Sequence, residues 1–144
     1  DKVNQLIEEW AREITPVAEP QSVYRTNPRY ENNPLLDKTF TFGVAILDFV
    51  EVLVEKRKYE VASQLIKSGT SIGANSREAQ NAESKADFVH KIKIALKEAD
   101  ETEYWLLLCN ASKHYPNTEE LLDNLHPILK ILNKILSTCK NSKK

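Results

Sequence analysis

The stretch from Lys85 to Cys109 reads KADFVHKIKIALKEADETEYWLLLC and decides the fold class. Its apolar and small side chains recur at alternating spacings of four and three residues: Phe88, Ile92, Ala95, Ala99, Thr102, Leu106 and Cys109. Such a heptad pattern is typical of a long helix that packs in a bundle or a coiled coil. Ser84 and Asp87 resemble a capping box, so the helix is expected to begin there.

Two helices are predicted before this stretch. Asn33 and Pro34 suit a helix start, because Asn caps and Pro fits the first turn, and this helix reaches about Glu55. Its expected apolar stripe is Phe40, Val44, Leu47, Val50 and Val54, with Glu51 as the alternative to Val50 at that position. The next helix is expected from about Tyr59 to Ala79. One of its stripes holds Val61, Leu65, Ile72 and Ala79.

A further helix is predicted after the Tyr115-Pro116 break, with Asn117 as its cap. Pro127 lies within it and is expected to kink or restart it. Its expected apolar face is Leu121, Leu125, Ile128, Leu132 and Ile135, together with Leu122, Leu129 and Leu136. Four long helices with short connections predict an all-α fold, an antiparallel up-and-down four-helix bundle over residues 35–138.

The bundle is flanked by two other segments. Residues 1–34 are predicted to form an N-terminal helix followed by a Pro-rich arm. The helix carries an apolar stripe of Val3, Leu6, Ile7, Trp10 and Ile14, and the arm carries Pro16, Pro20, Pro28 and Pro34. Residues 139–144 are predicted to be a basic tail.

Charge is balanced overall, with 20 basic and 21 acidic residues and a net charge of −1. Strong nucleic-acid binders usually carry a positive excess, so the total disfavours that class. The last fifteen residues, however, hold Lys130, Lys134, Lys140, Lys143 and Lys144 and no acid. These lysines are candidate phosphate contacts, and a solvated tail is the alternative.

The two cysteines, Cys109 and Cys139, have no metal-ligand spacing and are expected to be free thiols of a reducing compartment. No segment reaches the roughly 20 apolar residues that span a bilayer.

Gly69 and Gly73 each cost a helix roughly 1 kcal/mol relative to Ala, which close packing of another backbone would offset. Residues Tyr104 to Cys109 are apolar on every side, which predicts burial against another subunit or the N-terminal arm.

Two motifs resemble a known family. The first is KSGTSIGAN over residues 67–75 with Glu78 and Ala79, and the second is KADF over residues 85–88, continuing through IALKEA at 94–99 and ETEYWL at 101–106. Together they resemble the four-helix-bundle family encoded in intervening sequences of bacterial 23S ribosomal RNA genes. The resemblance is strong from about Asp37 to Leu108.

The resemblance implies a ring-like homopentamer in the bacterial cytoplasm, with no established enzymatic activity. The family is similar to the accessory protein of diversity-generating retroelements, which binds nucleic acid and a reverse transcriptase. The motifs also imply a buried polar network between helices or subunits, which fixes register. Its expected members are Asn75, Glu78, Lys97, Glu101 and Trp105, beside the packing glycines Gly69 and Gly73.

No catalytic residue, cofactor or metal ligand is predicted. Two Asp-x-x-His pairs, Asp87 with His90 and Asp123 with His126, leave one enzymatic alternative, a dimetal site completed by Glu51 and Glu78. The favoured function is an oligomeric scaffold that binds RNA, DNA or a nucleoprotein. The alternative is a protein-interaction module that uses the N-terminal arm and has no nucleic-acid role.

Overall fold

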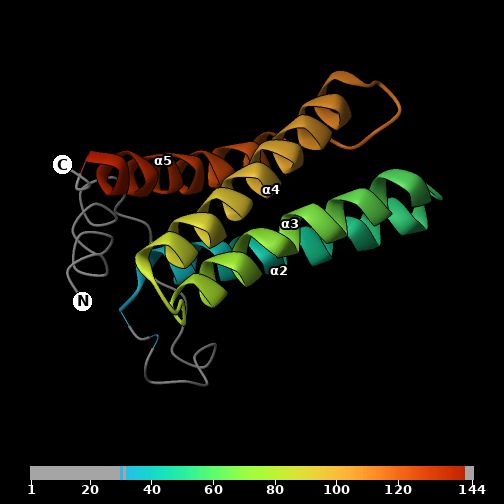
Figure 1. Ribbon diagram of the computed structural model, residues 1–144. Coiled ribbons are helices and arrows are strands. Elements are labelled where there is room, and N and C mark those ends of the chain that lie inside the picture. The colour runs from blue at the N-terminus through green and yellow to red at the C-terminus, as the bar shows by residue number, and fades with distance from the viewer. Residues whose placement is uncertain (1–29, 31, 142–144) are drawn as a thin grey trace.

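The computed structural model describes Tyr30 and residues 32–141, so the predicted N-terminal helix and most of the arm lie outside the described residues. The described part is all helical and contains no strand, which confirms the all-α prediction. Its helices, shown in Figure 1, are α2 (Pro34–Glu55), α3 (Tyr59–Ala79), α4 (Lys85–Ala111) and α5 (Glu119–Asn141).

Side-chain caps fix where α2 and α4 begin. The Asn33 side chain accepts a hydrogen bond of 3.2 Å from the Leu36 amide. The Ser84 hydroxyl accepts one of 3.0 Å from the Asp87 amide, as the capping box predicts. The return bond differs from the standard box, because the Asp87 carboxylate accepts from the Glu83 amide rather than from that of Ser84.

The heptad seam of α4 is confirmed, since every residue predicted on it is buried. The core face of α5 is confirmed for Leu121, Leu125, Ile128, Leu132 and Ile135, whereas Leu122, Leu129 and Leu136 are partly buried against the core. Its buried side chains are Leu121, Leu125, Ile128, Ile131, Leu132, Ile135 and Cys139. Helix α5 runs without interruption past Pro127, so the predicted restart does not occur. It also extends to Asn141 and buries Cys139, which the sequence placed in the basic tail.

The predicted core face of α2 is wrong. Phe40, Val44, Leu47 and Val54 are each at least 40% exposed, and of the predicted stripe only Val50 is buried. The face that packs inward consists of Leu35, Asp37, Thr39, Phe42, Ile46, Val50 and Leu53. The sequence from Phe40 to Val54 is apolar on two sides, so helical periodicity alone does not choose between them.

The connection between α4 and α5 depends on Thr118. Its hydroxyl donates a buried hydrogen bond of 2.6 Å to the Leu106 carbonyl, and its amide donates to Asn110 Oδ1 over 3.1 Å. Thr118 precedes the first helical residue and its carbonyl accepts from the Leu122 amide, so it occupies the cap position. Asn117, the predicted cap, instead accepts from the Glu119 amide.

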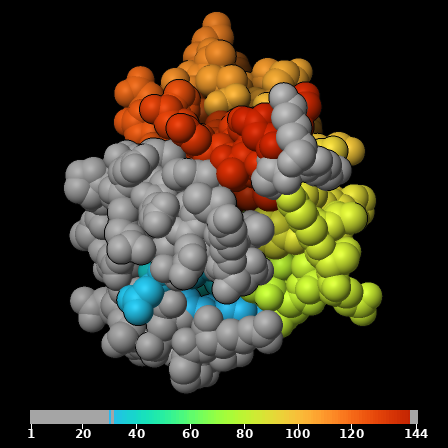
Figure 2. Space-filling view, turned by 60° about the vertical axis from the view of Figure 1, so that its left-hand side comes forward, coloured from blue at the N-terminus to red at the C-terminus, as the bar shows by residue number. Residues whose placement is uncertain are grey.

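Helices α2 and α3 pack closely at two glycines of α3. A Cβ at Gly69 would lie 2.8 Å from Ile46 Cγ1, and one at Gly73 would lie 3.3 Å from Thr39 Cβ. Since higher numbers in α3 meet lower numbers in α2, these helices run in opposite directions. Helix α4 contacts α3 and α5, and α5 contacts α2 as well. Figure 2 looks toward the end of the bundle where α2 begins and α5 ends.

Candidate interaction surfaces

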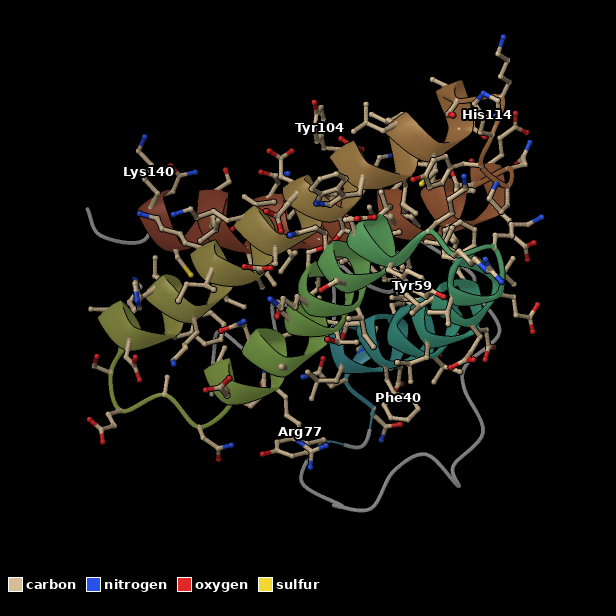
Figure 3. The ribbon with its side chains drawn as sticks, turned by 90° about the vertical axis from the view of Figure 1, so that its right-hand side faces the viewer. Phe40, Tyr59, Arg77, Tyr104, His114 and Lys140 are labelled. Atoms are coloured by element: carbon tan, nitrogen blue, oxygen red, sulfur yellow. The ribbon has the colours of Figure 1, made fainter. Side chains whose placement is uncertain are left out.

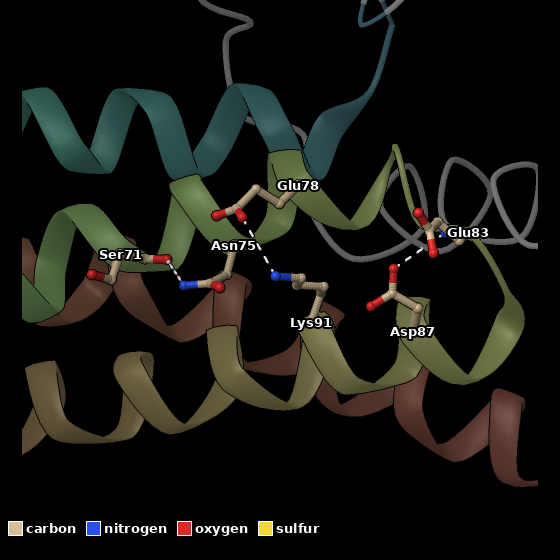
Figure 4. A network of polar contacts seen from close by, with 6 residues as sticks. All are labelled: Ser71, Asn75, Glu78, Glu83, Asp87 and Lys91. Carbon is tan, nitrogen blue, oxygen red and sulfur yellow. Dashed lines mark hydrogen bonds and ion pairs between the residues drawn. The ribbon is translucent and has the colours of Figure 1, made fainter.

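The residues of the predicted polar network lie on α3 and α4 but do not form one buried network within the chain. Glu78 Oε1 and Lys91 Nζ form an ion pair of 3.4 Å between the two helices (Figure 4). The Asn75 amide donates to the Ser71 carbonyl of its own helix over 2.9 Å. Lys97 and Glu101 are exposed on α4. A network between subunits therefore stays a prediction.

Trp105 differs from the other motif residues because its ring packs against the core. The indole nitrogen is buried and has no hydrogen-bond acceptor within the part of the chain that the structure describes. An indole N–H can only donate, and a buried unpaired donor costs about 1–3 kcal/mol. This donor points to an acceptor supplied from outside the described residues.

Beside Trp105, α4 exposes large apolar side chains. Tyr104 is 59% exposed, Leu107 49% and Leu108 44%. We call these three residues the α4 face. The Tyr104 and Trp105 rings meet edge to face with centroids 6.0 Å apart. The sequence predicted that this segment is buried on every side, and within the chain only Leu106 and Cys109 are buried.

A second apolar surface lies on α2 and α3. We call it the α2–α3 face, and its exposed members are Phe40, Val44, Leu47 and Val54 of α2 with Tyr59 and Ile66 of α3. In Figure 3, Phe40 and Tyr104 project from opposite sides of the molecule. Sequence reasoning missed this surface because it assigned the α2 residues to the core.

Three of the five candidate lysines lie on described parts of α5. Lys130, Lys134 and Lys140 are exposed, whereas Lys143 and Lys144 lie outside the described residues. A shallow groove of about 420 Å³ runs between α4 and α5. It is lined by Glu103, His126, Leu129, Lys130, Asn133 and Lys134. Across it, His126 Nε2 lies 3.9 Å from Glu103 Oε2.

The described residues give no support to the dimetal alternative. Among them, no three His, Cys, Asp or Glu side chains gather in a way that would hold a metal ion. The Asp87 carboxylate belongs to the α4 cap, and His126 faces Glu103. Burial raises the pKa of the Cys109 thiol, whereas a reactive cysteine needs a lowered one.

One acid on α4 is shifted by its surroundings. Partial burial raises the pKa of Glu98, and the neighbouring charge of Glu101 raises it further. Lys97 acts in the opposite direction. The charged form of Glu98 is therefore disfavoured in the folded chain.

Comparison with known proteins assigns the family. Residues 31–137 match the family model described as 23S rRNA-intervening sequence protein. The chain belongs to this family. The chain is also similar to a protein of unknown function from the S23 ribosomal protein family of Bacteroides thetaiotaomicron, whose crystal structure has been solved. The two sequences are 42% identical. The match has a TM-score of 0.67 and covers 71% of this chain and 97% of that one.

No match was found among curated proteins. The family match begins at residue 31, so the first 30 residues lie outside it. None of the helices in the described part is both long and apolar enough to cross a bilayer.

Proposed function

We propose that this protein is a non-enzymatic scaffold that assembles into a ring of identical copies and binds nucleic acid through α5. The observation that carries the proposal is the α4 face, with three large apolar side chains exposed beside a buried Trp105 N–H that lacks an acceptor. Contiguous apolar surface rimmed by polar residues marks interaction sites on soluble proteins. A neighbouring copy supplies both the apolar cover and the missing acceptor.

A closed ring suits this surface. Identical copies in a ring use a heterologous contact, in which one patch meets a different patch of the next copy. Tyr104 of the α4 face projects from one side of the molecule in Figure 3, and in a ring the next copy covers it with a surface other than its own α4 face. The resemblance to the 23S intervening-sequence bundles supports five copies, and those bundles also support a bacterial cytoplasmic setting. Cys109 and Cys139 are both buried and are not joined in a disulfide, which agrees with a reducing compartment.

Nucleic-acid binding rests on the α5 lysines, Lys130, Lys134 and Lys140. A net charge of −1 does not prevent local binding, since each phosphate contact depends on the field of nearby cations. Lys130 and Lys134 line the α4–α5 groove, where a phosphate backbone meets both together. In a ring of five copies, binding at one site raises the effective concentration of the nucleic acid at the other four sites, so weak contacts add up to tighter binding.

The test measures binding of labelled structured RNA and of single-stranded DNA by fluorescence anisotropy across a salt series. The expected affinity falls steeply with salt, because each neutralised phosphate releases counterions. Replacing Lys130 and Lys134 together by Glu is expected to weaken binding at least tenfold and to flatten the salt dependence. Lys56→Glu, an exposed charge reversal at the end of α2, is the matched control and is expected to change little.

Two results would reject nucleic-acid binding. One is no binding to either ligand at low salt by the intact assembly. The other is binding that the Lys130 and Lys134 substitutions leave unchanged. The protein-interaction function would then be favoured.

A further inference from the structure

The α2–α3 face is a second exposed apolar surface of the described chain, and Val44, Leu47 and Val54 are its α2 members beside Phe40. Its six side chains are between 37% and 56% exposed, and four of them follow one stripe of α2. Apolar patches of more than a few hundred Å² are uncommon on a monomer and usually mark a contact. Phe40 of this face projects from the opposite side of the molecule from Tyr104 of the α4 face, so the α4 face of the same chain does not cover it.

Gly43 lies in the middle of this face. It is three residues after Phe40 and four before Leu47, which places it between them on the helix surface. A Cβ at Gly43 would meet nothing within 4 Å, so no contact inside the described chain requires glycine there. Glycine weakens a helix, and close approach of another backbone is a usual reason to keep it.

The chain itself enters at one end of this face. The Tyr30 ring lies beneath the Arg77 guanidinium at 4.8 Å, and its hydroxyl accepts a hydrogen bond of 2.7 Å from the Asn81 side chain. Arg77 lies four residues after Gly73 and eleven after Ile66, on the same side of α3. The preceding 29 residues therefore start from the edge of the α2–α3 face.

We propose that residues 1–14 form an amphipathic helix that docks on the α2–α3 face of their own chain, over Gly43. The apolar stripe of this segment is Val3, Leu6, Ile7, Trp10 and Ile14. A helix of that length spans about 21 Å, which is also the distance along α2 from Phe40 to Val54. Residues 15–29 can extend to about 50 Å, so the segment can reach every part of the face from Tyr30.

Docking gives the segment before the family match a structural role. The first 30 residues fall outside the family match, and they cover an apolar face that would otherwise meet water or foreign proteins. Residues 1–14 then serve as a fifth helix of the fold and do not serve as a binding site for another protein.

The test follows Trp10 in the full chain, which contains only one other tryptophan, Trp105. Both are replaced by 5-fluorotryptophan, and Trp10→Phe assigns the two fluorine NMR signals. The shift of each signal between H₂O and D₂O measures solvent exposure. We expect Trp10 in the protein to show less than half the shift that it shows in a synthetic peptide of residues 1–29.

Two substitutions are expected to release Trp10 and restore the full peptide shift. Leu47→Glu puts a charge on the face, and Gly43→Leu fills the space that the docked helix needs. Neither is expected to unfold the bundle, because Leu47 is 46% exposed and a Cβ at Gly43 meets open space, and circular dichroism checks this. Val52→Glu, at an exposed α2 position outside the face, is the control and leaves Trp10 protected.

Three results would overturn the proposal. The first is Trp10 as exposed in the chain as in the peptide. The second is protection that survives both Leu47→Glu and Gly43→Leu. The third is protection that disappears in the Leu108→Glu variant, the α4-face substitution expected to give monomers, since docking within one chain does not need a neighbour. The Trp10 signal is read independently of assembly, so failure of the ring and failure of arm docking give different results.

Discussion

At the scale of single residues, Gly69 and Gly73 set the distance between α2 and α3. The side chains of Ile46 and Thr39 of α2 occupy the space that a side chain at Gly69 or Gly73 would need. The cost of roughly 1 kcal/mol for each helical glycine is offset by this close packing. The sequence predicted a close crossing from the four-residue spacing, but it gave no sign of which helix would approach.

Gly73→Leu is expected to lower the free energy of unfolding by about 1–3 kcal/mol, because the new side chain must displace Thr39 and the α2 backbone. Thermal unfolding followed by circular dichroism measures the change. Ala74→Leu, at the adjacent exposed position of α3, is the matched control and is expected to be close to wild type. A Gly73→Leu protein with unchanged melting temperature and unchanged mass would refute the close-packing role.

Glu98 is expected to make stability depend on pH. Because burial and Glu101 raise its pKa in the folded chain, the folded state holds this proton more tightly than the unfolded state. Its stabilising contribution is complete below the unfolded pKa and is lost as the pH rises through the folded value. Glu98→Gln should therefore raise the melting temperature at pH 7 more than at pH 4. An equal effect at both pH values would contradict the shift.

At the scale of helices, caps and periodicity predicted both ends of α2 and α3, the start of α4 and the whole core face of α4. It failed on the inward face of α2. Between Phe40 and Val54 this helix has two apolar stripes, one for the core and one on the surface, and only tertiary packing distinguishes them. The more regular stripe in the sequence is the exposed one.

The α4–α5 connection shows a second limit of local rules. Asn117 has the composition of a cap, yet Thr118 occupies the cap position because its hydroxyl reaches the Leu106 carbonyl of the preceding helix. That bond joins residues twelve apart in sequence, which a local pattern does not reveal. Pro127 likewise lies inside a continuous α5.

At the scale of the whole molecule, the surface divides among the helices. Helix α4 carries one apolar face, α2 with α3 carries another, and α5 carries the lysines. The sequence predicted extra burial near Tyr104 and a basic end of α5. It could not predict the α2–α3 face, because that required knowing which stripe of α2 points inward.

The candidate polar network illustrates the same dependence on assembly. Sequence resemblance brought Asn75, Glu78 and Lys97 together as one set. Among the residues that the structure describes, only Glu78 of these three contacts a charged partner, Lys91 of α4. Trp105 packs on the core with an unpaired N–H. If these residues form one polar network, the hydrogen-bond and charge partners that they lack among the described residues come from a neighbouring copy.

Assembly through the α4 face is tested most directly by the solution mass from light scattering of the wild type and of Leu108→Glu, with Val52→Glu as control. The wild type and the control are expected to have a mass of about five times 16.5 kDa, and Leu108→Glu the mass of one folded chain, because the contact would bury an unpaired charge. A monomeric wild type, or an assembly that Leu108→Glu leaves intact, would contradict assembly through the α4 face.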